Sequence, residues 1–232
     1  TGDAELLAAC KRLWDDLTLH KLYLTGGIGP SRHNEGFTRN YALPNETAYA
    51  ETCAAIALVF FAHRMLQIEA DGRYADVMEQ ALYNGVLSGV SLDGTKFFYE
   101  NPLASMGNHH RQEWFGCACC PPNVARLLAS LGQYVYSTGE ASLYTHLYVG
   151  GQATTQVAGR QVTVAQETNY PWDGDVGLRI AVAQSTRSDL MLRIPGWCDA
   201  ATVAINGKAA GVKAQPLSYI VIEREWADGD EV

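Results

Sequence analysis

The spacing of hydrophobic residues divides the chain into a helical first part and a strand-rich second part. Residues 3–20 carry apolar side chains about three or four positions apart, which is the period of an amphipathic helix. The same kind of spacing predicts helices over residues 52–69, 73–90 and 123–136. The last of these follows two prolines, which a first helical turn tolerates because its N–H groups need no helical partner.

Beyond about residue 138 the hydrophobic pattern becomes alternating, as in half-buried strands. The predicted strands cover residues 142–149, 161–167, 176–183, 189–194, 201–205 and 219–223. Turn sequences such as Asn206-Gly207 separate them, which is typical of an antiparallel β-sandwich.

The change of pattern predicts two domains, residues 1–138 and residues 139–232. The chain starts without an initiator methionine and stops where a further strand is expected to begin. We therefore expect a fragment of a longer protein, with an incomplete second domain. Two further segments stand out in the first part. Residues 25–47 form a long loop rich in Gly, Asn and Pro, and residues 94–99 read as a short hairpin arm.

Composition narrows the classes of partner. The chain has 232 residues, of which 47% are hydrophobic and 18% charged, with a formal net charge of −8. This charge argues against nucleic acid as a partner, because phosphate binding needs a basic surface. The sequence shows neither an apolar run of membrane-spanning length nor a signal-peptide pattern, so we expect no membrane association. The six cysteines are clustered rather than spread as a disulfide framework, which favours a reducing compartment or protection by a bound metal. We therefore expect a cytoplasmic location.

The cysteines also carry the candidate chemistry. Cys117, Cys119 and Cys120 lie within four residues, and Cys53 follows closely on the carboxylate of Glu51. Thiolates bind zinc strongly, and a carboxylate is an acceptable fourth ligand. The spacing differs from that of zinc fingers, so spacing alone leaves metal binding and plain core packing as open alternatives.

A shared site for Glu51 and Cys53 constrains the local structure. Residues two apart in a regular helix do not face the same way, so these two cannot both lie in the middle of one. Thr52 is a good N-cap residue. We therefore predict that the helix begins at Thr52 and that Glu51 lies on the preceding loop.

Several segments closely resemble the β-L-arabinofuranosidase family of glycoside hydrolases, GH127. In the first part they are YLTGGIG (23–29), LPNETAYAETCA (43–54) and WFGCACCPPNVARLLASLGQYVY (114–136). In the second part, NYPWDGDV (169–176) and LRIPGWC (192–198) resemble the downstream β-sandwich region of the same family. The resemblance runs over essentially the whole chain, and the combination of ETC with CACCPPN is specific.

The resemblance implies a fold and a site. The fold would be part of an (α/α)6 barrel followed by an antiparallel β-sandwich. A zinc ion would be held by one carboxylate and three thiolates: Glu51, Cys53, Cys119 and Cys120. Cys119 would also be the nucleophile, Glu35 the acid/base residue, and Tyr99 a residue that contacts the sugar. Without the resemblance, Glu35 would read as an ordinary solvated carboxylate of a loop.

Three functions remain open from the sequence. The first is a retaining glycoside hydrolase that acts on an arabinofuranoside or related sugar, with a thiolate in place of the usual nucleophilic carboxylate. The second is a structural zinc module of a carbohydrate-binding protein, since a closed four-ligand site is normally structural. The third is another metal-dependent sugar enzyme, such as a lyase or an epimerase. A homodimer, if formed, would use regions outside these residues. Cys117 would either support the metal ligands or be a packing residue, and we prefer packing. His109 and His110 are left without a role.

Overall fold

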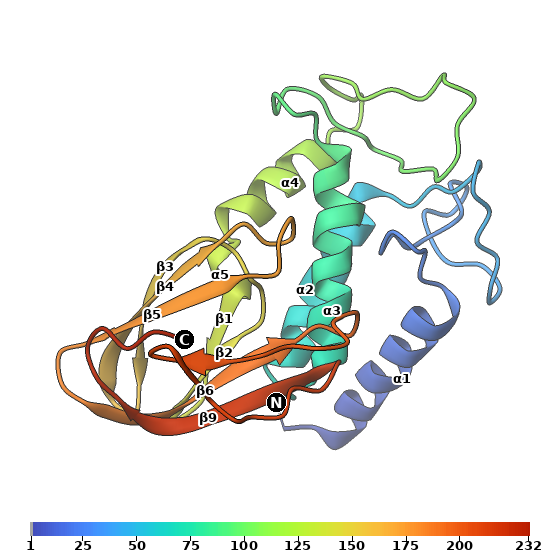
Figure 1. Ribbon diagram of the computed structural model, residues 1–232. Coiled ribbons are helices and arrows are strands. Elements are labelled where there is room, and N and C mark those ends of the chain that lie inside the picture. Colours follow the sequence, from blue (N-terminus) through green and yellow to red (C-terminus); the bar gives the residue numbers. More distant parts are fainter. Residues whose placement is uncertain (1) are drawn as a thin grey trace. The chain divides into compact units, whose positions relative to one another are not determined.

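The computed structural model describes residues 2–232, which divide into two compact units (Figure 1). One unit contains residues 2–61 and 77–128, and the other contains residues 62–76 and 129–232. Among the described residues, no helix has both the length and the hydrophobicity needed to cross a membrane. The division into domains after residue 138 stays a prediction.

Helix α1 (Ala4–His20) begins where the sequence predicts, because Asp3 caps it. The Asp3 carboxylate accepts hydrogen bonds from two backbone N–H groups of the first turn, at 2.9 and 3.1 Å. Such caps satisfy donors that have no partner inside the helix. Trp14 is the buried residue of α1, and its ring meets Phe61 edge to face with centroids 5.5 Å apart. This aromatic contact packs α1 against α2 (Thr52–Leu66) at Phe61.

The helix predicted over residues 73–90 is divided into three segments of different pitch. It starts as α3 (Gly72–Gln80), continues as the π-helix η1 (Ala81–Val86) and ends as the 3₁₀ helix η2 (Leu87–Gly89). Hydrophobic spacing cannot separate these helix types, because the apolar positions recur at similar intervals in all of them.

The helix predicted over residues 123–136 begins earlier and is interrupted. The structure has α4 (Cys120–Ala129) and, after a turn, α5 (Gly132–Val135). Because the two prolines fit within the first turn of α4, the helix can begin at Cys120 itself. The hairpin arm predicted over residues 94–99 is reduced to single bridges between Phe97 and two partners, Val90 and Gln112.

Gly26 holds the loop that leads toward the candidate site close to the first residue of η1. Its φ is +75°, and an added Cβ would lie 2.7 Å from the Cα and N atoms of Ala81. Replacing Gly26 with alanine is expected to lower the free energy of unfolding by about 2–5 kcal/mol. This sum combines about 1–2 kcal/mol for a left-handed alanine and about 1–3 kcal/mol for overpacking.

Gly94→Ala is the matched control for Gly26→Ala. Gly94 has a φ of +71° with nothing within 4 Å of an added Cβ, so it should show only the backbone part of the loss. Chemical denaturation of the two variants measures the difference. Equal losses would contradict the close approach of Gly26 to Ala81.

The strands belong to the second unit and form three sheets. They are β1 (Tyr136–Thr138), β2 (Ser142–Thr145), β3 (Gly151–Val157), β4 (Arg160–Thr168), β5 (Val176–Val182), β6 (Thr186–Ile194), β7 (Ala204–Ile205), β8 (Lys208–Ala209) and β9 (Ser218–Trp226). Within the described residues, one sheet has the order β1-β2-β6-β9, another has β3-β4-β5, and β7 pairs with β8. Most pairs are antiparallel, but β2 and β6 run parallel, which alternation alone could not reveal.

The two larger sheets share one hydrophobic core, which makes the unit a β-sandwich. Residues on β5 alternate between buried and exposed positions, and those on β9 do so over most of its length. The register places Val164 beside Ile180 in one sheet and Leu190 beside Ile222 in the other, and all four side chains are buried in this core. The predicted fold class, helices followed by a mainly antiparallel sandwich, is confirmed.

Candidate functional site

The segment before α2 turns sharply so that Glu51 and Cys53 can face one point. Ala50 has a φ of +38°, a left-handed conformation that is strained for a residue with a side chain. The Glu51 carbonyl then accepts the N–H groups of Ala54 and Ala55 at 3.0 and 3.1 Å, so Glu51 occupies the capping position of α2. As predicted, Glu51 precedes the helix and Cys53 lies in its first turn.

Thr52 does not have the predicted capping role. Its hydroxyl donates to the carbonyl oxygen of Phe98 at 2.9 Å, and its backbone N–H donates to the carbonyl of Tyr99 at 2.9 Å. Both bonds tie the start of α2 to the segment that carries Tyr99. The N-cap prediction was wrong because this contact, distant in sequence, uses the hydroxyl instead.

The other two thiols lie at the start of α4. Cys119 immediately precedes the helix, and Cys120 is its first residue and fully buried. The Cys119 carbonyl accepts the N–H of Asn123 at 3.1 Å, as in the first turn of a helix. The N-terminal ends of α2 and α4 therefore meet at the cysteines. The helix dipoles at these two N-terminal ends favour negatively charged sulfur there.

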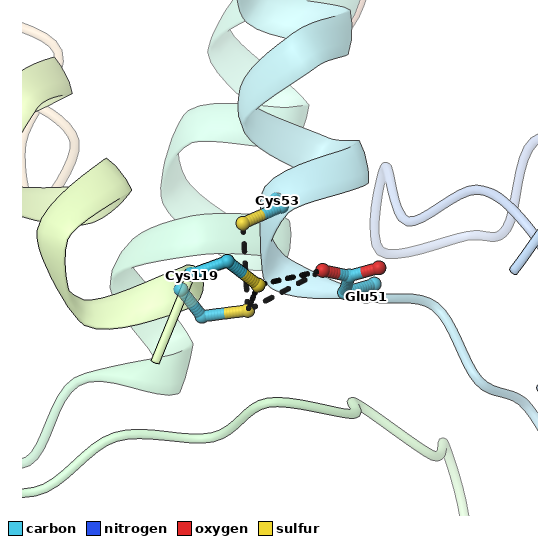
Figure 2. Close-up of side chains that lie close together, drawn as sticks. Glu51, Cys53 and Cys119 are labelled. Carbon is cyan, nitrogen blue, oxygen red and sulfur yellow. Dashed lines mark hydrogen bonds between the residues drawn. The ribbon is translucent and has the colours of Figure 1, made fainter. Parts of the chain in front are cut away.

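The four side chains converge as a metal site requires (Figure 2). The Cys120 sulfur lies 3.5 Å from that of Cys53 and 3.7 Å from that of Cys119. Glu51 Oε1 lies 3.3 Å from the Cys119 sulfur and 3.6 Å from the Cys120 sulfur. All four ligand atoms lie within 4.8 Å of one another.

The four separations of 3.3–3.7 Å are close to those around a tetrahedral zinc ion. Bonds of about 2.3 Å to sulfur and about 2.0–2.2 Å to oxygen separate the ligand atoms by roughly 3.5–3.8 Å. All six cysteines are free, and the close sulfur pairs are too far apart for disulfides, whose bond length is about 2.05 Å. The donor set is therefore compatible with a metal ion.

The contacts and burial of the three thiols shift their pKa values in different directions. The hydrogen bond with Cys120 lowers the pKa of the Cys53 thiol to about 7. The same bond raises the pKa of Cys120, and burial adds to that rise. Burial raises the pKa of the Cys119 thiol to about 11. The three thiols therefore do not all ionise together unless a positive charge is bound among them.

Tyr99 and Tyr49 extend the site away from the cysteines. The Tyr99 hydroxyl lies 3.0 Å from the Cys119 sulfur, and this hydrogen bond is the main reason that the pKa of Tyr99 is raised. The Tyr49 hydroxyl donates to Glu35 Oε1 at 3.1 Å. The two tyrosine rings lie near each other, with centroids 6.2 Å apart. Glu35 and Cys119, the predicted acid/base residue and nucleophile, are thus placed at the two ends of a tyrosine pair.

A cavity of about 580 Å³ lies beside these residues. Glu35, Tyr49 and Tyr99 line it, together with His109 and His110. The ring of His109 stacks on Phe98 at 4.7 Å, so that histidine is held in place. A cavity of this size next to a candidate nucleophile is large enough for a sugar ring.

Two further residues of the cavity differ from expectation or were missed. Cys117 is exposed and lines the cavity, so the interpretation as a packing residue is wrong. Arg32 also lines it and forms an ion pair with Glu100 at 2.5 Å. Nothing in the local sequence identifies this pair, because the partners come from distant loops.

Tyr49 is the main site residue that sequence reasoning missed. The signal was its position two residues before Glu51, close in sequence to a predicted metal ligand. A lone tyrosine in an apolar segment reads equally well as core packing, however.

Comparison with known proteins places the chain in a family. A model of the GH127 β-L-arabinofuranosidase catalytic domain matches residues 1–133. The chain belongs to this family. A model of the GH127 middle domain matches residues 142–232, so the resemblance seen in the sequence motifs is confirmed.

Individual GH127 relatives agree with the family models. The chain is 40% identical over 239 residues to a non-reducing end β-L-arabinofuranosidase from Bifidobacterium longum, covering 95% of this chain and 36% of the relative. A crystal structure of a GH127 β-L-arabinofuranosidase from Geobacillus stearothermophilus T6 is 51% identical, with a TM-score of 0.93. The match covers 99% of this chain and 38% of that chain.

A second solved structure, a GH127 β-arabinofuranosidase, is 40% identical with a TM-score of 0.93, and the match covers 99% of this chain and 39% of that one. The chain therefore spans well under half the length of the relatives it matches.

Proposed function

We propose that the protein is a retaining glycoside hydrolase of the β-L-arabinofuranosidase type. The observation that supports this most directly is that a cluster of three thiols and a carboxylate lies beside a cavity that Glu35 also lines. Relatives with this activity in their names share the family. The substrate is an arabinofuranoside or a closely related sugar.

We assign zinc to Glu51, Cys53, Cys119 and Cys120. Three thiolates with one carboxylate favour zinc over magnesium or calcium, which prefer oxygen ligands. When bound, the ion keeps the coordinating thiols deprotonated at neutral pH. The structural fit is the agreement between the observed ligand separations and tetrahedral geometry.

Cys119 is the proposed nucleophile because it is the more accessible of the two α4 thiols. Cys120 is fully buried, whereas Cys119 is partly exposed and contacts Tyr99, which lines the cavity. In the first step the Cys119 thiolate forms a C–S bond with the anomeric carbon while the glycosidic C–O bond breaks. Glu35 gives its proton to the departing oxygen. Tyr99 contacts the sugar and the attacking sulfur.

The second step returns the enzyme to its starting state. Glu35, now a carboxylate, removes a proton from water, whose oxygen attacks the anomeric carbon. The C–S bond breaks, and the electron pair returns to Cys119. Two displacements on the same carbon leave its configuration unchanged, which defines a retaining enzyme.

The structural zinc module remains the second candidate, because a metal with four protein ligands is normally structural. Labelling distinguishes the two functions. An arabinofuranosyl analogue with an electrophilic anomeric carbon should attach to Cys119, as peptide mass mapping would show. A module without catalysis would bind zinc and leave Cys119 unlabelled, and so would a lyase or an epimerase that forms no covalent intermediate.

Zinc content gives the first quantitative test. The purified protein is expected to contain one zinc per chain, measured by atomic emission. Cys53→Ser should lose most of this zinc while leaving the nucleophile and acid/base residue in place, because serine is a poor zinc ligand. Cys10→Ser serves as the control, because Cys10 lies on α1 outside the cluster. This variant should retain one zinc per chain. Equal zinc content in both variants would show that Cys53 is not a zinc ligand.

We also propose the organisation around this site. Residues 1–138 form part of the catalytic (α/α)6 barrel and residues 139–232 belong to a β-sandwich domain. The clustered, unpaired cysteines support a cytoplasmic location.

A further inference from the structure

The backbone of Tyr49 is held on both sides by other loops. Its N–H donates to the carbonyl of Pro30 at 3.2 Å, and its own carbonyl accepts the N–H of Asn101 at 3.1 Å. The side chain is 5% exposed, so the ring cannot turn freely. Tyr49 is therefore a fixed point beside the cavity.

Glu35, in contrast, lies on a narrow loop turn. Its φ is +47°, and a single antiparallel bridge between Ser31 and Gly36 closes the turn around it. Within residues 2–232, the side-chain hydrogen bond to Glu35 comes from the Tyr49 hydroxyl, at 3.1 Å to Oε1. The Tyr49 hydroxyl therefore holds one oxygen of this carboxylate in place.

We infer that Tyr49 is the positioning residue for the acid/base carboxylate, an assignment that rests on the proposed role of Glu35. The phenol occupies Oε1, which leaves Oε2 to protonate the departing oxygen and later to accept a proton from water. Tyr49 also ties Glu35 to the metal cluster, because it lies two residues before the proposed ligand Glu51 on the same segment. One rigid segment thus sets the positions of the acid/base residue and of one metal ligand.

Tyr49→Phe removes only the hydroxyl. A hydrogen bond to a charged group contributes enough that its loss should lower kcat on an unactivated arabinofuranoside by about 10- to 100-fold. KM should change little. The zinc content should stay at one per chain.

Tyr23→Phe is the matched control. Tyr23 is 2% exposed, and its hydroxyl donates to the backbone carbonyl of Pro44 at 3.2 Å, away from Glu35. Like Tyr49→Phe, the variant Tyr23→Phe therefore removes a buried tyrosine hydroxyl from the first compact unit. Its kcat and KM should match those of the unmodified enzyme. If Tyr49→Phe behaves like Tyr23→Phe, Tyr49 is only a core residue.

A double mutant separates this inference from the proposed function. In the background of Glu35→Gln, the further change Tyr49→Phe should reduce activity less than threefold, because Tyr49 acts through Glu35. If the activity losses of the two single variants multiply in the double mutant, Tyr49 acts through another group, such as Tyr99. That result would overturn the inference. If Glu35→Gln alone keeps full activity, the acid/base assignment fails instead, whatever Tyr49→Phe does.

Discussion

Replacing Cys119 with alanine is expected to reduce glycosidase activity to background in the enzyme at its natural length. The substitution removes the proposed nucleophile and one of four zinc ligands together, so both covalent steps and the metal site are lost. Small added nucleophiles are not expected to restore turnover, because the damaged metal site remains. Hydrolysis of an aryl β-L-arabinofuranoside measures the loss, and atomic emission measures the zinc.

Cys117→Ala is the control that separates this thiol from its neighbour. Cys117 lies outside the four-residue cluster, although it lines the cavity. The variant should keep one zinc per chain and should still be labelled at Cys119 by the electrophilic sugar analogue. If Cys117→Ala loses labelling and zinc as Cys119→Ala does, then the wrong thiol has been assigned. Labelling of Cys117 instead of Cys119 in the unmodified enzyme would also show that the wrong thiol has been assigned.

The helical and sandwich parts could be predicted from hydrophobic periodicity alone. The apolar residues of α1 and α2 recur at helical spacing, and β4, β5, β6 and β9 largely alternate between buried and more exposed residues, so the sequence carries a strong signal for these elements. β3 was missed because its sequence, GQATTQV, is polar and four of its seven residues are exposed. It pairs with β4 on one side only, at the edge of its sheet, where the hydrophobic pattern is weakest.

The candidate site was only partly predictable from residue chemistry. Cysteine spacing left metal binding and packing equally open, and the resemblance to GH127 selected the ligand set that the structure then brings together. The left-handed turn at Ala50, which lets Glu51 and Cys53 face one point, has no signal in the sequence. The same is true of the bond from Tyr49 to Glu35, since it joins two loops whose approach depends on the whole fold.

Replacing Glu35 with alanine is expected to separate proton transfer from metal binding. Loss of a general acid/base residue typically lowers the rate by about 10²- to 10⁴-fold, and we expect that loss on an unactivated arabinofuranoside. The zinc content should stay at one per chain, since Glu35 lies outside the ligand cluster. Glu113→Ala replaces an exposed carboxylate that does not line the cavity, and should change neither quantity.

The leaving group and the second nucleophile then locate the defect within the reaction. An aryl leaving group departs without a proton, so the first step of Glu35→Ala should remain fast on an aryl arabinofuranoside. The second step should be slow, because no base activates water, and the thioglycosyl-enzyme on Cys119 should accumulate and be visible by mass spectrometry. Azide is an anion and needs no base. It should attack the anomeric carbon, release the Cys119 thiolate and give an arabinofuranosyl azide of retained configuration. Loss of zinc in Glu35→Ala, or an equal loss on aryl and unactivated substrates with no azide product, would show that Glu35 is not the acid/base residue.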